Sequence, residues 1–259
     1  MSRSAWVVRR LRHHRFGFTG LFLCLIVGIV LVVQDRNADL PPAEIDRLRL
    51  RAGAGQDRLA LKRLQQAAQH GSLAAQRASA SVLLAGPDKV SVAQGLEFAR
   101  TAAERGDSAA QYLLAKTLFD GTPVQRADRR QARLWFQKAA AQNHPQAAYF
   151  LGLIYKNGYG IALDHAAAAG WFARAAALGN PDAMFMLGNA YLDGDGVAQD
   201  QARARRLFQQ AAELEHPLAA QMLGYALRDG ALGLQPDARQ SEQMMVEVEH
   251  ALHHPRAVF

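Results

Sequence analysis

The sequence predicts an all-α protein in which an N-terminal transmembrane helix precedes a right-handed α-solenoid of about five helix-turn-helix repeats. Two observations indicate this fold class. Residues 16–33 form an uncharged apolar run long enough to cross a bilayer. Residues 70–252 repeat one pattern of Ala, Leu, Gly and aromatic positions about every 36 residues. Half of the 259 residues are hydrophobic and many alanines come in pairs, which favours closely packed helices.

The net charge of +7 is distributed unevenly along the chain. Five of these charges precede the first acidic residue and come from Arg3, Arg9, Arg10, Arg12 and Arg15. Residues 16–259 therefore carry only +2 and have no basic stripe of the kind that binds a phosphate backbone. We expect no nucleic-acid partner.

The predicted membrane span is 16-FGFTGLFLCLIVGIVLVV-33, in which 13 of the 18 residues are Leu, Ile, Val or Phe. A helix of this length extends about 27 Å, close to the thickness of the hydrocarbon core. Arginines precede the span and mixed charges follow it, so residues 1–15 are expected to form a cytoplasmic tail. The solenoid would then lie in the periplasm of a bacterium, tethered to the inner membrane. A cleavable signal peptide is the alternative, but no small-x-small site follows the run.

The region after the span is expected to be a linker over residues 34–56. Pro41, Pro42 and 53-GAG-55 flank a short helical segment at 43–52. One further helix at about 57–69 would cap the solenoid, which extends over residues 57–252. Residues 253–259 would form a tail.

Residues 143–178 and 179–214 are two consecutive copies of the repeat and align without a gap. The positions they share are Ala147 and Ala183, Leu151 and Leu187, Gly152 and Gly188, Tyr155 and Tyr191, Gly158 and Gly194, Gly160 and Gly196, Asp164 and Asp200, and Phe172 and Phe208. A less regular copy precedes them, and degenerate copies lie at both ends, as is common in solenoids. Gly152 and Gly188 lie beside the apolar stripe of a helix, where the missing Cβ would allow a neighbouring helix to approach closely.

This pattern resembles the Sel1-like repeat, a relative of the tetratricopeptide repeat. The shared signature is Ala-x-x-x-Leu-Gly-x-x-Tyr-x-x-Gly-x-Gly-Val-x-x-Asp, followed by an aromatic pair and Ala-Ala. Residues 179–214 match it nearly throughout, and the resemblance covers about residues 70–252. It implies a helical hairpin in each repeat and a curved superhelix.

The segment 193-DGDGVAQD-200 is similar in composition to a calcium-binding loop. An EF-hand loop needs an oxygen ligand at its fifth position and a Glu at its twelfth, but Val197 and Ala204 stand there. We therefore interpret the segment as a turn in which Gly194 ends one helix and Asp200 caps the next. No metal site is expected.

The sequence gives no sign of catalysis or of a cofactor. No nucleophile lies beside a base in a recognisable motif, and Glu247 and Glu249, two residues apart, point to different sides of a helix. Cys24 is the only cysteine, so the chain cannot build a thiolate metal cluster. We expect a protein that is not an enzyme and has no small-molecule substrate.

The remaining candidate site is the concave face that the first helix of each repeat would line. By similarity to tetratricopeptide grooves, this face is expected to carry Tyr112, Lys116, Phe119, Tyr149, Leu153, Lys156, Phe185, Asn189, Leu192, Tyr225 and Arg228. Aromatic residues with Lys and Arg suit an amphipathic or acidic peptide. For Tyr112, Tyr149 and Phe185, packing between helices is an equally good explanation.

These observations predict a non-catalytic, membrane-tethered adaptor that binds a protein partner in the cell envelope. The alternative is a regulator or subunit that contacts peptidoglycan or an exported polysaccharide directly. The expected groove has the aromatic platforms that sugars need but few carboxylates, so a protein partner is the better hypothesis.

Overall fold

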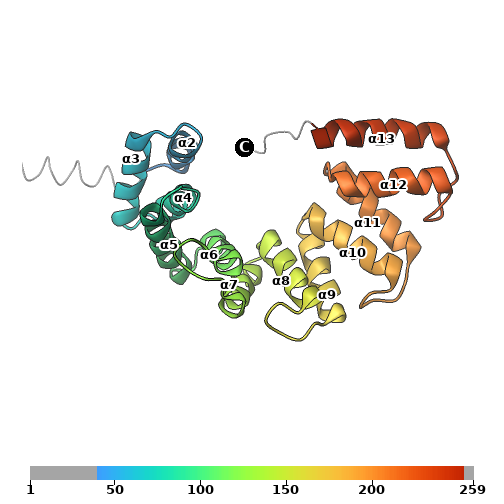
Figure 1. Cartoon of the computed structure of the whole chain (residues 1–259), viewed down its shortest axis with the longest axis horizontal. Coiled ribbons are helices and arrows are strands. Elements are labelled where there is room, and N and C mark those ends of the chain that lie inside the picture. Colours follow the sequence, from blue (N-terminus) through green and yellow to red (C-terminus); the bar gives the residue numbers. More distant parts are fainter. Residues whose placement is uncertain (1–39, 254–259) are drawn as a thin grey trace, which may run out of the picture. The chain divides into compact units, whose positions relative to one another are not determined.

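The computed structural model describes residues 40–253, and within that range it contains twelve α-helices and no strand (Figure 1). The helices are α2 (Pro42–Gly53), α3 (Arg58–Gln69), α4 (Leu73–Leu84), α5 (Lys89–Glu104), α6 (Ser108–Asp120), α7 (Arg129–Ala141), α8 (Pro145–Asn157), α9 (His165–Ala177), α10 (Pro181–Asp193), α11 (Gln201–Glu213), α12 (Pro217–Asp229) and α13 (Ala238–His253). The predicted all-α class is therefore confirmed for this part of the chain. The predicted cytoplasmic tail and the predicted transmembrane helix at 16–33 lie outside the described residues. Among the helices in residues 40–253, none combines the length and the apolar composition needed to span a bilayer.

The helices belong to two compact units, and the boundary between them lies within α5, after Phe98. In the first unit α2 packs against α3 and α4. Ile45, Leu48 and Ala52 recur at helical spacing on α2, and all three are buried in the core of this unit. This corrects the expectation of a linker over residues 34–56, because residues 42–53 form a packed helix. The sequence predicted α3 as a single capping helix, but α3 packs against α2.

The second unit consists of the hairpins α6–α7, α8–α9, α10–α11 and α12–α13, and each second helix also packs against the first helix of the next hairpin. One leucine occupies the same buried position in each first helix. These residues are Leu114, Leu151, Leu187 and Leu223, with exposed fractions between 0% and 6%. The repeat register predicted from the sequence is therefore confirmed.

Each of these hairpins is closed by one aspartate before its second helix. The carboxylates of Asp128, Asp164, Asp200 and Asp237 each accept a hydrogen bond of 2.9 Å from the backbone N–H three residues later. The backbone N–H of the same aspartate donates to a carbonyl of the first helix, at 2.7 or 2.8 Å. The capping role predicted for Asp200 is confirmed, as is the left-handed Gly194 at the end of α10.

In the hairpins α8–α9 and α10–α11, a glycine of the first helix lies directly against a phenylalanine of the second. A Cβ atom added to Gly152 would lie 2.4 Å from Cε1 of Phe172, and one added to Gly188 would lie 2.6 Å from Cε1 of Phe208. Both phenylalanines are buried, with exposed fractions of 2% and 0%. The glycines are therefore needed for space, as the sequence predicted.

We expect the substitution Gly152→Ala to destabilise the protein by about 1–3 kcal/mol, because the new methyl group overlaps the ring of a buried phenylalanine. The matched control is Gly170→Ala within α9, where an added Cβ meets no atom within 4 Å. That change should be neutral or stabilise by up to about 1 kcal/mol through helix propensity. Urea unfolding of the full chain, followed by circular dichroism, measures both. Equal effects of the two substitutions would contradict the packing.

Candidate functional site

The eleven predicted partner-binding residues lie on the first helices α6, α8, α10 and α12 of the second unit. They occupy three recurring positions: Tyr112, Tyr149 and Phe185; Lys116, Leu153, Asn189 and Tyr225; and Phe119, Lys156, Leu192 and Arg228. None of the eleven is buried, and Tyr225 and Arg228 are exposed. We call these eleven residues the first-helix surface.

The aromatic residues at the first of these positions also pack between helices. The Tyr112 ring stacks on His144, with the centroids 4.7 Å apart, and the Phe185 ring stacks on His216 at 4.9 Å. Tyr149 lies against Phe172 at 6.0 Å. Burial raises the pKa of Tyr112 and of Tyr149 above the ordinary value for tyrosine. These rings therefore stabilise the repeats, and only their exposed edges are open to a partner.

The residue before each first helix caps that helix. Asp107, His144, Asn180 and His216 each accept a hydrogen bond from the backbone N–H of an alanine three residues later, and the two histidines do so through Nδ1. Nε2 of His216 also lies 3.3 Å from a carboxylate oxygen of Asp182 in the preceding repeat. The sequence predicted only turn residues at His144 and His216. Their alignment with Asp107 and Asn180 was the signal for a capping role.

Two of the three predicted cations on the first-helix surface have acidic partners on their own helix. Lys116 pairs with Asp120 and lies 5.5 Å from the Phe150 ring centroid. Arg228 donates two hydrogen bonds to Asp229, at 2.8 and 3.1 Å. Lys156 has no carboxylate partner among the residues that the structure describes. Of the three predicted cations, Lys156 is therefore the one that an external carboxylate can pair with most readily.

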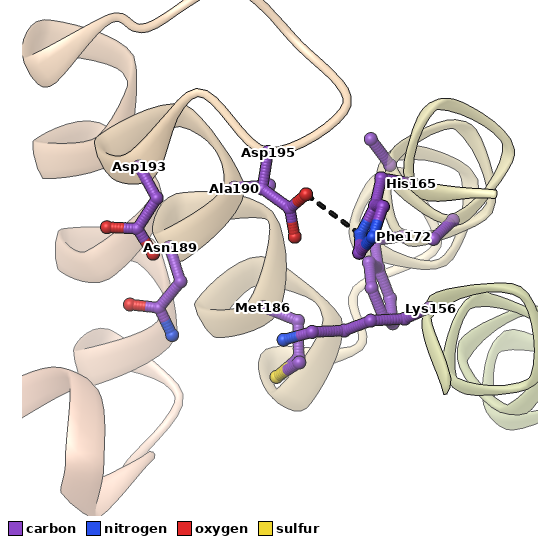
Figure 2. A pocket seen from close by; sticks show the side chains of 10 residues that line it. Lys156, His165, Phe172, Met186, Asn189, Ala190, Asp193 and Asp195 are labelled. Carbon is purple, nitrogen blue, oxygen red and sulfur yellow. Dashed lines mark ion pairs between the residues drawn. The ribbon is translucent and has the colours of Figure 1, made fainter. Parts of the chain in front are cut away.

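Lys156 lies beside a small polar recess between the α8–α9 hairpin and α10 (Figure 2). Asn189 and Asp193 of α10 line the same recess, and at its rim Nδ1 of His165 lies 2.8 Å from Oδ1 of Asp195. The enclosed volume is 20 Å³, about the space of one water molecule. The recess is too small for an organic substrate, but its ammonium, amide and carboxylate groups can contact polar side chains of a partner. Sequence reasoning had not paired His165 with Asp195, because they belong to different repeats.

In residues 40–253, no three His, Cys, Asp or Glu side chains come together in a way that could hold a metal ion. The aspartates of 193-DGDGVAQD-200 have other roles, since Asp200 caps α11 and Asp195 faces His165.

The capped, stacked hairpins define the chain as an α-solenoid built from helical-hairpin repeats. Residues 108–144, 145–180, 181–216 and 217–245 match the Sel1 repeat, and together they make up more than half of the sequence. The chain therefore belongs to the Sel1 repeat family.

Solved structures of similar fold come from bacteria. The crystal structure of a Sel1 repeat protein from Oxalobacter formigenes superposes with a TM-score of 0.73 at 27% identity, covering 82% of this chain and 88% of that one. A second is c5321, a protective antigen present in uropathogenic Escherichia coli strains, with a TM-score of 0.68 at 30% identity. That match covers 81% of this chain and 45% of the antigen.

A sequence relative is an uncharacterized protein, NMB1327, of Neisseria meningitidis serogroup B. It is 41% identical over 75 residues, which are 29% of this chain and 15% of that protein. The chain thus spans a small part of this relative's length. Sel1 repeat proteins are generally scaffolds for protein interactions, and the fold is typically non-enzymatic, so a protein partner agrees with the family.

We expect part of the stability of the protein to be lost as the pH falls below about 6.5, the value for an unfolded histidine. Burial lowers the pKa of His144 below that value, so the folded state binds its proton less readily than the unfolded state does. The stabilisation is complete above the unfolded pKa and decreases as the pH falls toward the folded pKa. The measurement is the thermal midpoint of the full chain at pH 7.5 and at pH 5.

The matched control is His144→Asn, because Asn180 performs the same capping role one repeat later. This variant retains a cap without the titration, so its midpoint should fall less between the two pH values. A fall equal to that of the unsubstituted protein would show that His144 does not contribute to the pH dependence.

Proposed function

We propose that this protein is a non-catalytic adaptor that is tethered to the bacterial inner membrane and binds a protein partner with its first-helix surface. The observation that carries the proposal is the recurrence of this surface on α6, α8, α10 and α12, with none of its eleven residues buried. A row of equivalent surface positions on consecutive repeats can contact one continuous segment of a partner. Membership of the Sel1 repeat family supports the same role.

The chemistry of the surface supports an amphipathic partner segment with acidic residues. Leu153 and Leu192 offer half-buried apolar contacts, and the edges of Tyr112 and Tyr149 add aromatic area. Lys156 supplies a cation that forms no ion pair among the described residues, although Asp193 and Asp195 line the recess beside it. Apolar and aromatic anchors with a few charges are the usual composition of an interface centre.

The tether is proposed from the sequence of residues 16–33 and from the arginines before it. Holding the solenoid at the membrane would raise its effective concentration toward partners in the same membrane. A modest affinity of the first-helix surface would then be enough for assembly of a complex.

A photoreactive residue in place of Leu153 or Asn189 should crosslink to the partner in living cells, because both positions are part of the first-helix surface. The control position is Leu134 of α7, which is 48% exposed but belongs to a second helix. Equal crosslinking from Leu134 would refute the assignment of the surface.

We also expect Lys156→Glu to reduce the yield of the same adduct, whereas Lys138→Glu on α7 leaves it unchanged.

For the tether, the full chain should remain in the membrane pellet after carbonate extraction, and deletion of residues 16–33 should release it. Alkaline phosphatase fused to the C-terminus should be active, since that enzyme requires the oxidising periplasm. An inactive fusion of normal abundance would show that the solenoid is in the cytoplasm.

A further inference from the structure

Three arginines surround an open recess at the start of α7, outside the first-helix surface. Arg126 lies in the loop before the helix, and Arg129 and Arg130 are its first two residues. Gly160, from the loop of the next hairpin, lines the opposite side, and the recess has a volume of about 670 Å³. We call this feature the arginine recess.

The charge of the arginine recess is not balanced within the protein. All three arginines are exposed, and none has a carboxylate partner among residues 40–253. Asp128 also lines the recess and caps α7 through the N–H of Gln131, so one carboxylate offsets part of the charge of the three arginines. The recess therefore has a local excess of positive charge. Elsewhere in the second unit, cations such as Lys116, Arg203 and Arg228 form ion pairs with aspartates.

The fold does not require these arginines. At the equivalent positions the next repeat has Ala162, His165 and Ala166, and the one after it has Ala198, Gln201 and Ala202. Cations in the first turn of a helix are also opposed by the helix dipole, and in α7 the capping Asp128 is the one acidic residue beside them. Arg129 also contacts aromatic rings of the fold, but the presence of Arg126 and Arg130 beside it is best explained by an external ligand.

Arg129 is held in a conformation suited to binding. Its guanidinium carbon lies 5.6 Å from the centroid of the Phe119 ring and 4.9 Å from that of the Tyr159 ring. These aromatic contacts restrain the side chain without engaging its N–H donors. The planar guanidinium can therefore donate two parallel hydrogen bonds to one carboxylate.

We propose that the arginine recess is a second docking site, which binds an acidic peptide segment of a protein partner. A segment with several Asp or Glu residues matches three separated guanidinium groups better than one small anion would. At the start of α7 one N–H that could hold a phosphate, that of Gln131, already donates to the carboxylate of Asp128. The recess is also open and polar, which favours an extended chain over a small molecule.

The test uses the full chain in a neutral detergent, with the five arginines of residues 1–15 replaced by Gln in every sample so that they do not bind the probe. The probe is a fluorescein-labelled peptide of alternating Glu and Ser, and a Gln–Ser peptide is its neutral counterpart. Fluorescence anisotropy at low salt gives the dissociation constant. We expect binding of the Glu–Ser peptide only.

The triple variant R126E/R129E/R130E should raise the dissociation constant by about tenfold or more, as the loss of several modest ion pairs implies. The matched control, R58E/R206E/R239E, makes the same change in net charge at exposed positions elsewhere and should leave the affinity within about twofold. Arg129→Lys retains the charge but loses the planar fork, so it should weaken binding measurably. Circular dichroism verifies the fold of each variant.

Equal loss of affinity in the triple variant and in its control would overturn the proposal, because binding would then depend on net charge alone. Tighter binding of a single-stranded oligonucleotide to the recess, lost in the triple variant, would also overturn it. Glycerol phosphate is a competitor that carries a phosphate and no carboxylate. If it displaces the labelled peptide as effectively, per unit of negative charge, as the unlabelled Glu–Ser peptide does, the recess is a phosphate site instead. Crosslinking from Leu153 tests the first-helix surface separately, so the two proposals can fail independently.

Discussion

The contact between a first-helix glycine and a second-helix phenylalanine is the constraint on which the hairpins α8–α9 and α10–α11 depend. With no Cβ at Gly152 and Gly188, the rings of Phe172 and Phe208 enter the space between two helices and become buried. This contact sets how closely the helices of a hairpin approach each other. Because equivalent leucines are buried in successive first helices, the other side chains of those helices also recur at equivalent positions, and a surface that repeats along the chain becomes possible.

Polar groups then fix the hairpins in register. One aspartate per hairpin bonds both helices, and one capping residue per repeat starts the next first helix. Where that cap is histidine, its ring also stacks on an aromatic residue of the preceding first helix. The same side chains thus build the interface between repeats and form part of the floor of the first-helix surface, so stability and binding cannot be assigned to separate residues there.

Much of the packing within the hairpins could be predicted from the sequence, because the repeat copies can be compared with one another. Two copies that align at 36-residue intervals identify the buried leucines, the space-saving glycines and the capping aspartates. The packing of α2 was missed because one short helix between prolines and glycines has no second copy for comparison. The His165–Asp195 contact and the arginine recess were also missed, since each joins residues of neighbouring hairpins. Which side chains meet across a repeat boundary depends on the packing of whole helices.

The proposed function requires that the first helices of the second unit form the binding surface. Hydrogen–deuterium exchange of the full chain, with and without its purified partner, tests this most directly, because binding suppresses the local opening through which helical amides exchange. We expect the amides of α8 and α10 around Leu153 and Asn189 to exchange more slowly when the partner is bound. Protection confined to the second helices α7, α9 and α11, with α8 and α10 unchanged, would contradict it.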